Sequence, residues 1–403
     1  MTGPEHERSR RHFLQASAAA LAFPATVARG ANETLNIGLI GVGGRCRALA
    51  SALVKVPDVR IAAVCDVYGP HLEHGVSIAD AKAFHSANYR ELLDRKDLDA
   101  VLIATPDHWH TPIAVAACEA GKDVYVEKPL THNLEEGQSI VDAQNKNRRI
   151  VQVGTQQRSM PQYRRGKDLI REGRLGKVVK VHMTWNRNQE RTKRGPQGVD
   201  RNRLDWKAFL GNAPDQPFDD FRYRNWRWFW DFGGGIFTDL MVHQVDIVHW
   251  LLGLDHPSTA TSIGGFNAYA DDWQTPDTVQ TLMTYPGGLQ AHFEGTFSNA
   301  REGECVIFMG TDATLYLDRG RMELHPERGK GKAEEMVIGS GPKGRDFYEQ
   351  PDGELLHLTE WANCVRTRST PSAPAEAGVS AASAAHLANR ALRSGRAEAW
   401  GGA

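Results

Sequence analysis

A glycine-rich loop, Gly41-Val42-Gly43-Gly44-Arg45-Cys46, separates a short apolar run from an amphipathic stretch. This placement predicts a strand that turns directly into a helix. Gly41 permits the tight turn, and Gly43 lets the backbone approach a pyrophosphate group at the positive end of the helix. Cys46 stands in place of the third glycine of the usual fingerprint and is small enough for close helix–strand packing. The loop therefore predicts a dinucleotide-binding fold, with Gly44 and Arg45 also contacting the cofactor.

The pattern around this loop indicates an α/β protein. Apolar runs alternate with amphipathic stretches up to about Val153, which predicts a doubly wound parallel sheet. The expected strands are 36–40, 59–65, 100–104, 124–126 and 150–153, and the expected helices are 45–55, 71–84, 111–120 and 134–147. After Gly154, alternating runs predict a large open, mostly antiparallel sheet with helices on one face. Its expected strands are 178–185, 259–267, 278–285, 289–297, 305–309 and 313–317, and the expected helices are 162–172, 236–252, 355–366 and 379–392.

The length of 403 residues favours more than one domain. We expect a signal segment at 1–30, a nucleotide-binding domain at 31–154 and an α+β domain at 155–403, whose last helices pack back on the first domain. The chain has 48 basic and 49 acidic residues, so its charge gives no reason to expect nucleic acid or an anionic membrane as a partner.

The first residues resemble a twin-arginine export signal. Arg10-Arg11 precedes Phe13-Leu14, and a weakly apolar alanine-rich run leads to small residues before Ala28. The run is too short to span a bilayer. A disordered basic tail is the alternative reading. Export would make the protein periplasmic, without a membrane anchor after cleavage, and would carry a folded protein out with its cofactor already bound.

Further residues at expected strand ends point to the cofactor. Asp66 lies 20 residues past Cys46, where a carboxylate binds both hydroxyls of the adenosine ribose and repels a 2′-phosphate. NAD is therefore favoured over NADP, although Asp66 could instead be a helix N-cap. Two more segments follow expected strands and are expected to reach the same edge. They contribute Thr105, Pro106 and His110, and Glu127 and Lys128.

A third segment carries a candidate acid/base pair. Asp239 and His243 are four residues apart after a glycine triplet, Gly233-Gly234-Gly235, so they share one helix face. A carboxylate one turn before an imidazole can orient it as a general base. The pair could also be an ordinary helical contact, or half of a metal site with His182 or Asp246. Because the spacing fixes no third ligand, we expect no metal.

Taken together, these motifs resemble the glucose–fructose oxidoreductase/inositol dehydrogenase/MocA (Gfo/Idh/MocA) family from Leu35 to the C-terminus. The resemblance implies a Rossmann domain followed by an α/β domain whose open sheet often forms an oligomer interface, so we expect a homodimer or homotetramer. It implies that Lys128 lies beside the nicotinamide and the reacting hydroxyl, with Asp239 and His243 as the acid/base pair. Pro129 matches a proline that is often cis-linked.

Substrate-side residues follow less directly. The string Arg224-Asn225-Trp226-Arg227-Trp228-Phe229-Trp230 places aromatic rings beside guanidinium groups, which suits a sugar pocket or equally well a packed core. Family position adds further candidates. The expected substrate residues are Trp109, Arg158, Tyr163, Trp185, Arg224 and Trp228.

Three functions are consistent with this set of residues. The first is an exported NAD-dependent oxidoreductase that acts on a sugar, polyol or glycoside and recycles a tightly held cofactor. The second is a redox-neutral glycoside hydrolase that oxidises a ring hydroxyl transiently; it would need an added acid/base such as His182, Tyr163 or His110. The third is a sugar-binding protein without turnover.

Overall fold

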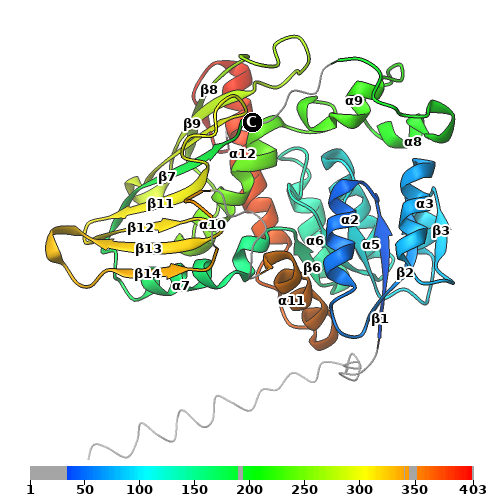
Figure 1. Ribbon diagram of the computed structural model, residues 1–403, viewed down its shortest axis with the longest axis horizontal. Coiled ribbons are helices and arrows are strands. Elements are labelled where there is room, and N and C mark those ends of the chain that lie inside the picture. Colours follow the sequence, from blue (N-terminus) through cyan, green and yellow to red (C-terminus); the bar gives the residue numbers. More distant parts are fainter. Residues whose placement is uncertain (1–33, 189–193, 340, 345–351, 402–403) are drawn as a thin grey trace, which may run out of the picture.

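The computed structural model describes residues 34–188, 194–339, 341–344 and 352–401. The expected signal segment at 1–30 lies outside these residues. Two sheets stand side by side, and one long helix near the C-terminus runs between them (Figure 1). The predicted fold class, a Rossmann-like parallel sheet followed by a mostly antiparallel sheet with helices, is confirmed.

The first sheet is entirely parallel, with the strand order β3-β2-β1-β4-β5-β6. Its strands are β1 (Leu35–Ile40), β2 (Val59–Cys65), β3 (Phe84–Ser86), β4 (Ala100–Ile103), β5 (Asp123–Val126) and β6 (Val151–Val153). Strand β3 was not predicted, because three residues are too few to show a period. The helix expected over 71–84 ends earlier, since Ala79 takes an extended conformation.

Helices cover both faces of this sheet. They are α2 (Gly44–Leu53), α3 (Gly69–Ile78), α4 (Tyr89–Leu93), α5 (His110–Glu119) and α6 (Gly137–Asn147). One core lies between the sheet and α5 and α6, and another lies under α2. Strands β1, β4 and β5, in the middle of the sheet, are almost completely buried, as expected for a parallel sheet covered on both sides.

The second sheet has nine strands in the order β14-β13-β12-β11-β7-β10-β9-β8-β15. They are β7 (Val178–Asn186), β8 (Thr259–Gly265), β9 (Thr278–Thr284), β10 (Gln290–Thr296), β11 (Glu304–Gly310), β12 (Ala313–Leu317), β13 (Arg321–Pro326), β14 (Glu334–Val337) and β15 (Glu398–Ala399). Among the described residues of this sheet, β7 and β10 are the only parallel neighbours. Strands β13, β14 and β15 were not predicted.

One face of the second sheet carries the core and the other is open. Helices α7 (Pro161–Arg171), α10 (Val242–Leu252) and α12 (Ala375–Ser394) lie on the core face (Figure 1). Side chains alternate along the strands: Ala291 and Phe293 of β10 are buried, while His292 and Glu294 point to the open face. Large apolar side chains stand on that open face, including Ile263 and Leu282.

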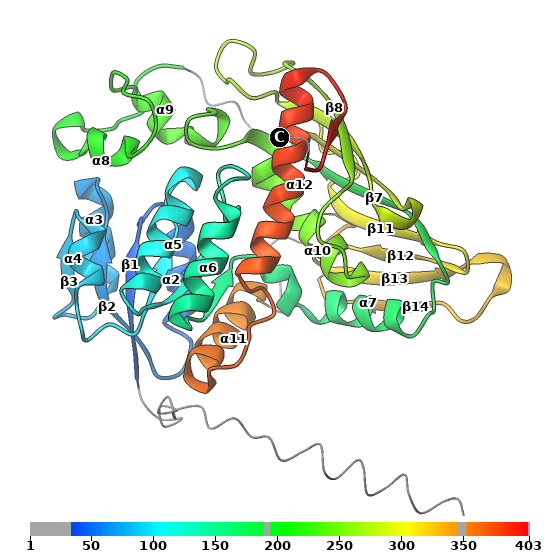
Figure 2. The ribbon, with the colours of Figure 1, turned by 180° about the vertical axis from the view of Figure 1, so that it is seen from behind.

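A long segment between β7 and α10 reaches back over the first domain. It contains two short helices, α8 (Trp206–Leu210) and α9 (Asp220–Arg224), where the sequence indicated only a loop. Figure 2 shows both helices above the edge of the parallel sheet at which the strands end. This segment therefore covers the edge of the sheet where a dinucleotide binds in a Rossmann fold.

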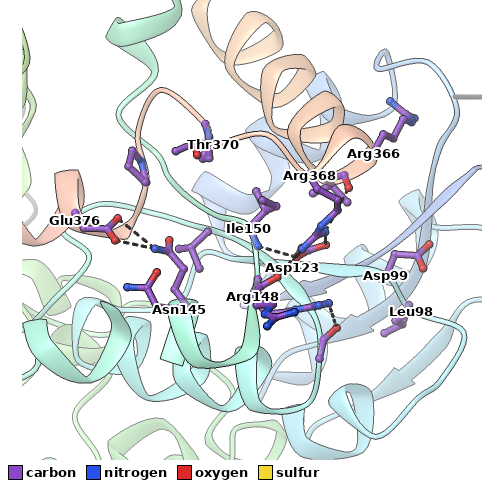
Figure 3. Close-up of a pocket in the computed structure, with 17 residues that line it drawn as sticks. Leu98, Asp99, Asp123, Asn145, Arg148, Ile150, Arg366, Arg368, Thr370 and Glu376 are labelled. Carbon is purple, nitrogen blue, oxygen red and sulfur yellow. Dashed lines mark hydrogen bonds and ion pairs between the residues drawn. The ribbon is translucent and has the colours of Figure 1, made fainter. Parts of the chain in front are cut away.

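The C-terminal part of the chain also ties the domains together. Helix α11 (Gly353–Thr367) buries Leu358 and Trp361 against the core under α2. Beyond it, Arg368 binds Asp123 at the start of β5, with 3.1 Å between Nη2 and Oδ1 (Figure 3). A cavity of about 710 Å³ lies there, at the opposite edge from the glycine loop. Because Arg149, Arg366 and Arg368 all donate to acceptors of their own chain, we interpret it as structural.

Within the described ranges, no helix is long and apolar enough to cross a membrane.

Candidate active site

The larger of two adjoining cavities, about 790 Å³, opens at the carboxyl edge of the parallel sheet. It is lined by most of the predicted cofactor residues, namely Gly41, Gly43, Gly44, Arg45, Asp66, Thr105 and Pro106. Gly43 is the N-cap of α2, and no side chain caps this helix. A Cβ at Gly43 would project into open space, so the helix N-terminus faces the cavity through a gap that suits a pyrophosphate. The cavity fits a dinucleotide.

The glycine at the start of the loop is required by its backbone. Gly41 has φ +81°, in the left-handed region, and a Cβ there would lie 2.8 Å from the backbone nitrogen of Thr105. The loop after β1 and the loop after β4 therefore touch at this point. That contact fixes the shape of the cavity floor.

Asp66 joins the second strand to the glycine loop. Its carboxylate accepts hydrogen bonds from the backbone of Val42 (2.6 Å) and of Tyr68 (2.8 Å). The second bond resembles the N-cap interaction considered as an alternative, although α3 begins only at Gly69. Because a carboxylate has more than two acceptor sites, Asp66 can still bind ribose hydroxyls at the cavity wall.

The smaller cavity, about 260 Å³, adjoins the first and shares Arg45, Thr105 and Arg227 with it. It contains the three predicted catalytic residues, Lys128, Asp239 and His243. They come from the end of β5 and from the start of the long helical segment of the second domain. The two domains thus meet at this cavity.

Lys128 and Asp239 form an ion pair inside the smaller cavity. The ammonium of Lys128 donates to Oδ1 of Asp239 at 2.9 Å and to its backbone carbonyl at 2.6 Å. Arg227 donates to the same Oδ1 at 3.2 Å. Burial alone would raise the pKa of Asp239, but the positive charges of Lys128 and Arg227 outweigh it and hold this pKa well below its ordinary value.

His243 stands beside this pair without taking part in it. Its Nδ1 is buried and has no hydrogen-bond partner among the described residues, and its ring lies 5.4 Å from that of Trp185. Burial, and then the charges of Lys128 and Arg319, hold the pKa of His243 well below its ordinary value, so the imidazole is neutral.

The predicted contact between Asp239 and His243 is therefore wrong. The sequence placed both in one α-helix over 236–252, but residues Phe237–Met241 form a π-helical turn and α10 begins only at Val242. The carboxylate of Asp239 binds the nearby cations instead of the imidazole. π-Helical turns are frequent at functional sites.

Arg45, Glu127 and His110 hold the loops around the site in place. Arg45 bridges Glu127 (2.8 Å) and Glu354 of α11, so the cofactor loop is tied to β5 and to the C-terminal segment. The ring nitrogens of His110 lie 2.7 Å from the carbonyl oxygen of Pro129 and 2.9 Å from that of Thr105. His110 thus joins the two loops instead of presenting a nitrogen to the cofactor.

Asp107 also lines this cavity, although no sequence motif pointed to it. It is buried, and burial raises its pKa well above the ordinary value despite the opposing charges of Lys128 and Arg227. The neutral carboxylic acid is therefore favoured. The sequence could have pointed to Asp107, because this residue lies in the same segment as the predicted cofactor residues Thr105 and His110.

The predicted substrate residues divide into three groups. Trp185 lines the smaller cavity as expected, and the guanidinium groups of Arg187 and Arg319 lie over its ring at 5.3 and 5.1 Å. Trp109 and Arg224 line the larger cavity and so belong to the cofactor side.

Three predicted substrate residues line neither cavity. Arg158 forms two 2.7 Å hydrogen bonds to buried Asp246, and buried Tyr163 accepts a hydrogen bond from Gln157. Trp228 stacks on Trp273 with 4.2 Å between ring centroids, so this part of the aromatic string is core packing. Each of these partners lies far along the chain or carries no motif, so the sequence could not show it.

His182, considered earlier as an added acid/base or metal ligand for this site, lies elsewhere. It alternates with Trp185 on β7 and points to the open face of the second sheet. Trp226 and Arg227, from the string that suggested a sugar pocket, also line the cavity. It is completed by residues to which no sequence motif pointed, namely Gln156, Arg187, Leu240, Arg319 and Glu354.

Comparisons with known proteins agree with this architecture. The oxidoreductase family described by an NAD-binding Rossmann fold (GFO_IDH_MocA) matches residues 35–155, and its C-terminal alpha/beta domain matches residues 167–399. An inositol 2-dehydrogenase of Salmonella paratyphi B is 26% identical over 276 residues, covering 67% of this chain and 69% of that protein. A glycosyl hydrolase family 109 protein of Saccharopolyspora erythraea is 39% identical over 131 residues, covering 30% and 28%.

A solved structure extends the agreement in fold to nearly the whole chain. A levoglucosan dehydrogenase in complex with NADH and levoglucosan superposes with a TM-score of 0.72 at 18% identity, covering 91% of this chain and 99% of that one. The predicted recognition of the family and of an NAD-binding domain is confirmed. The chain belongs to the Gfo/Idh/MocA oxidoreductase family.

Proposed function

We propose that this protein is an exported NAD-dependent oxidoreductase that acts on a hydroxyl group of a sugar, polyol or glycoside. The observation that carries the proposal is the Lys128–Asp239 ion pair beside the unpartnered nitrogen of His243, where the cofactor cavity meets the smaller one. Relatives named as inositol and levoglucosan dehydrogenases support the substrate class.

The larger cavity would hold the cofactor. The N-terminus of α2 behind Gly43 would bind the pyrophosphate, and Asp66 would bind the adenosine ribose and disfavour a 2′-phosphate. When bound, NAD supplies the acceptor for the hydride that leaves the substrate carbon. Thr105, at the point shared by both cavities, would place the nicotinamide end toward Lys128.

The residues of the smaller cavity would handle the proton. Neutral His243 lines this cavity and would accept the hydroxyl proton of the substrate. The ammonium of Lys128, fixed by Asp239, would donate a hydrogen bond to the same oxygen and stabilise the negative charge that develops there. Asp239 would act through Lys128, because its carboxylate is engaged by cations.

Sugar binding is supported by the walls of the same cavity. Trp226 offers an aromatic face, and Arg187 and Gln156 offer hydrogen-bond donors. Aromatic faces suit the C–H faces of sugar rings, and donors suit their hydroxyls.

We further propose a closed cofactor cycle outside the cytoplasm. The twin-arginine pattern at Arg10-Arg11 would place the folded protein in the periplasm, where no pool of free nicotinamide cofactor replaces what dissociates. A second sugar or ketone would then accept the electrons. The α8–α9 segment, which lines the cofactor cavity with Phe209 and Tyr223, supports slow dissociation.

A homodimer or homotetramer through the open sheet face is part of the proposal. Ile263 and Leu282 are 65% and 60% exposed there, which is unfavourable for apolar side chains left in water. Light scattering should give the mass of a dimer or tetramer. Leu282→Lys should lower this mass towards that of a single chain, without changing the absorbance of bound cofactor. A wild-type monomer would exclude this arrangement.

The experiment for the main proposal begins with protein purified without added nucleotide. Acid denaturation should release close to one NAD or NADH per chain, identified by chromatography. A panel of sugars and polyols should then change the bound nicotinamide absorbance for at least one class of substrate. Protein that neither releases nor binds a dinucleotide would overturn the proposal.

A redox-neutral glycoside hydrolase is the second candidate, and Asp107 favours it. The three acid/base groups first considered for it are poorly placed: His182 is on the other sheet face, Tyr163 is buried and bonded, and His110 joins two loops. Asp107 instead offers a neutral carboxylic acid inside the cavity, able to protonate a leaving group.

Nitrophenyl glycosides separate the two candidates. Release of nitrophenol without free NAD or an oxidant would support hydrolysis, and Asp107→Asn should abolish that release while preserving the change in nicotinamide absorbance. If no nitrophenol is released from glycosides of many sugars in both anomeric forms, the hydrolase candidate is excluded and only the oxidoreductase remains.

A further inference from the structure

A cluster of metal-ligating side chains lies on the open face of the second sheet, on its two central parallel strands. His292 of β10 is the direct register partner of His182 of β7. Glu294 follows His292 by two residues, so its side chain points to the same face. The parallel pairing thus brings two imidazoles and one carboxylate from two strands to one place.

The distances within this cluster are close to those of a metal site. One ligand atom from each of the three side chains lies within 4.8 Å of the other two. The rings of His182 and His292 stack with 5.0 Å between centroids and an angle of 23°, and Nε2 of His182 lies 4.0 Å from Oε1 of Glu294. That separation is too long for a hydrogen bond.

The nitrogen of His182 also lacks any other partner. Its Nε2 is buried and has no hydrogen bond within the part of the chain that the structure describes. A buried polar atom without a partner is costly and calls for an explanation, such as an ion. In the single chain, the side chains of His182 and Glu294 are about 30% exposed, so the cluster lies at the surface of the sheet and not in its core.

We propose that His182, His292 and Glu294 form a binding site for a divalent transition metal ion, for which zinc is best suited. Zinc prefers imidazole nitrogen and carboxylate oxygen at about 2.0–2.2 Å, and three protein ligands leave a fourth position for water. At these bond lengths, tetrahedral ligand atoms lie roughly 3.4 Å apart. Small side-chain rotations would close the cluster from its present separations.

The charges around the cluster are compatible with a cation. Glu294 supplies one negative charge, and Lys180, also on β7, supplies an opposing positive charge.

This site is distinct from the catalytic cavity. His182 and Trp185 point to opposite faces of β7, so the strand and its core side chains separate the ion from the cofactor. An ion here would join β7 to β10 and stabilise the central parallel pair of the sheet. Its effect is therefore expected on metal affinity and thermal stability, independently of the oxidoreductase activity.

The test uses the full chain, without an affinity tag, stripped with a chelator and then titrated with zinc chloride against a chromophoric chelator. We expect the wild-type protein to bind one zinc ion per chain, and we expect this binding to require the side chains of the cluster. His292→Ala and Glu294→Gln should each weaken binding by at least about tenfold, because loss of even an outer-shell partner costs 10–100-fold. Zinc should also raise the unfolding temperature of the wild type and not that of His292→Ala.

A matched control exists on the same sheet. His325 of β13 pairs with Glu323 at 3.0 Å and belongs to no three-ligand group among the described residues. His325→Ala should therefore keep the wild-type zinc affinity. Circular dichroism and the unfolding temperature of the metal-free variants show whether each one folds. The proposal is overturned if wild-type protein binds no zinc, or if folded His292→Ala binds it as tightly as His325→Ala does.

Discussion

At the scale of single residues, the proposed chemistry depends on how charge is shared among neighbouring side chains. Asp239 is held ionised by Lys128 and Arg227, while His243 is kept neutral by burial and by the positive charges of Lys128 and Arg319. The sequence identified these residues by their types and spacing. It paired Asp239 with the wrong partner, because Lys128 lies more than a hundred residues away along the chain.

Lys128→Met tests the role of the ammonium group. We expect the rate of hydride transfer to fall by about 10²–10⁴-fold, because a positioned donor to the reacting oxygen is lost. Bound dinucleotide should stay near the wild-type amount, since the glycine loop and Asp66 are unchanged. Single-turnover absorbance measures the rate, and Lys55→Met, at an exposed position, is the control. An unchanged rate would refute the assignment.

The pH dependence of kcat/KM tests the state of His243. Its pKa is lowered from the ordinary 6.5, so the neutral form that accepts a proton persists into more acidic solution and is lost only below the lowered pKa. We expect activity near its plateau at about pH 5.5. Asp239 adds no loss there, because its pKa is also lowered. An acid limb centred at or above pH 6.5 would contradict the neutral buried imidazole.

At the scale of elements, close contacts at loops position the proposed catalytic groups. The π-helical turn Phe237–Met241 carries Asp239, and it follows a glycine triplet in which Gly235 has φ +67°. The sequence predicted a helix here from its apolar pattern. It could not reveal the π-helical turn, because the preceding contact with Thr275 comes from a distant loop.

Gly235→Ala should therefore impair both stability and activity. An alanine held at this positive φ costs about 1–2 kcal/mol. In addition, its Cβ would lie 2.7 Å from Cβ of Thr275. Gly121→Ala is the matched control, since Gly121 has φ +78° but open space around it. Denaturant unfolding should show a larger loss for Gly235→Ala, and only this variant should lower kcat/KM. Equal losses in stability would show that the clash is relieved.

At the scale of the whole molecule, the candidate catalytic cavity exists because two domains are held together. The sequence predicted both sheets and the cofactor edge, since parallel strands have continuous apolar runs and their loops carry the polar motifs. It misplaced part of the sugar-binding string, because Trp228 stacks on Trp273 in another loop. It also gave no signal for Glu354 of α11, which reaches Arg45 only after the C-terminal segment has folded back.

Replacing Arg368 tests how much the folded-back C-terminal segment contributes to the stability of the protein. Arg368→Ala leaves the nearly buried carboxylate of Asp123 without its cation, which should cost about 1–3 kcal/mol, less than for a fully buried pair because Arg368 is partly exposed. Arg171→Ala, which breaks an exposed pair with Asp168, should cost below about 0.5 kcal/mol. Thermal unfolding measures both. Equal, small effects would mean that this ion pair does not hold the domains.

The central claim is that Lys128, Asp239 and His243 act on a sugar hydroxyl beside a dinucleotide that stays bound. The most direct measurement is the absorbance of bound nicotinamide after a sugar from the panel is added to protein freed of unbound nucleotide. We predict that the reduced band appears in the wild type and is lost in His243→Ala, which should retain its dinucleotide. Reduction that proceeds equally in both proteins, or a wild-type protein that carries no dinucleotide, would contradict the account.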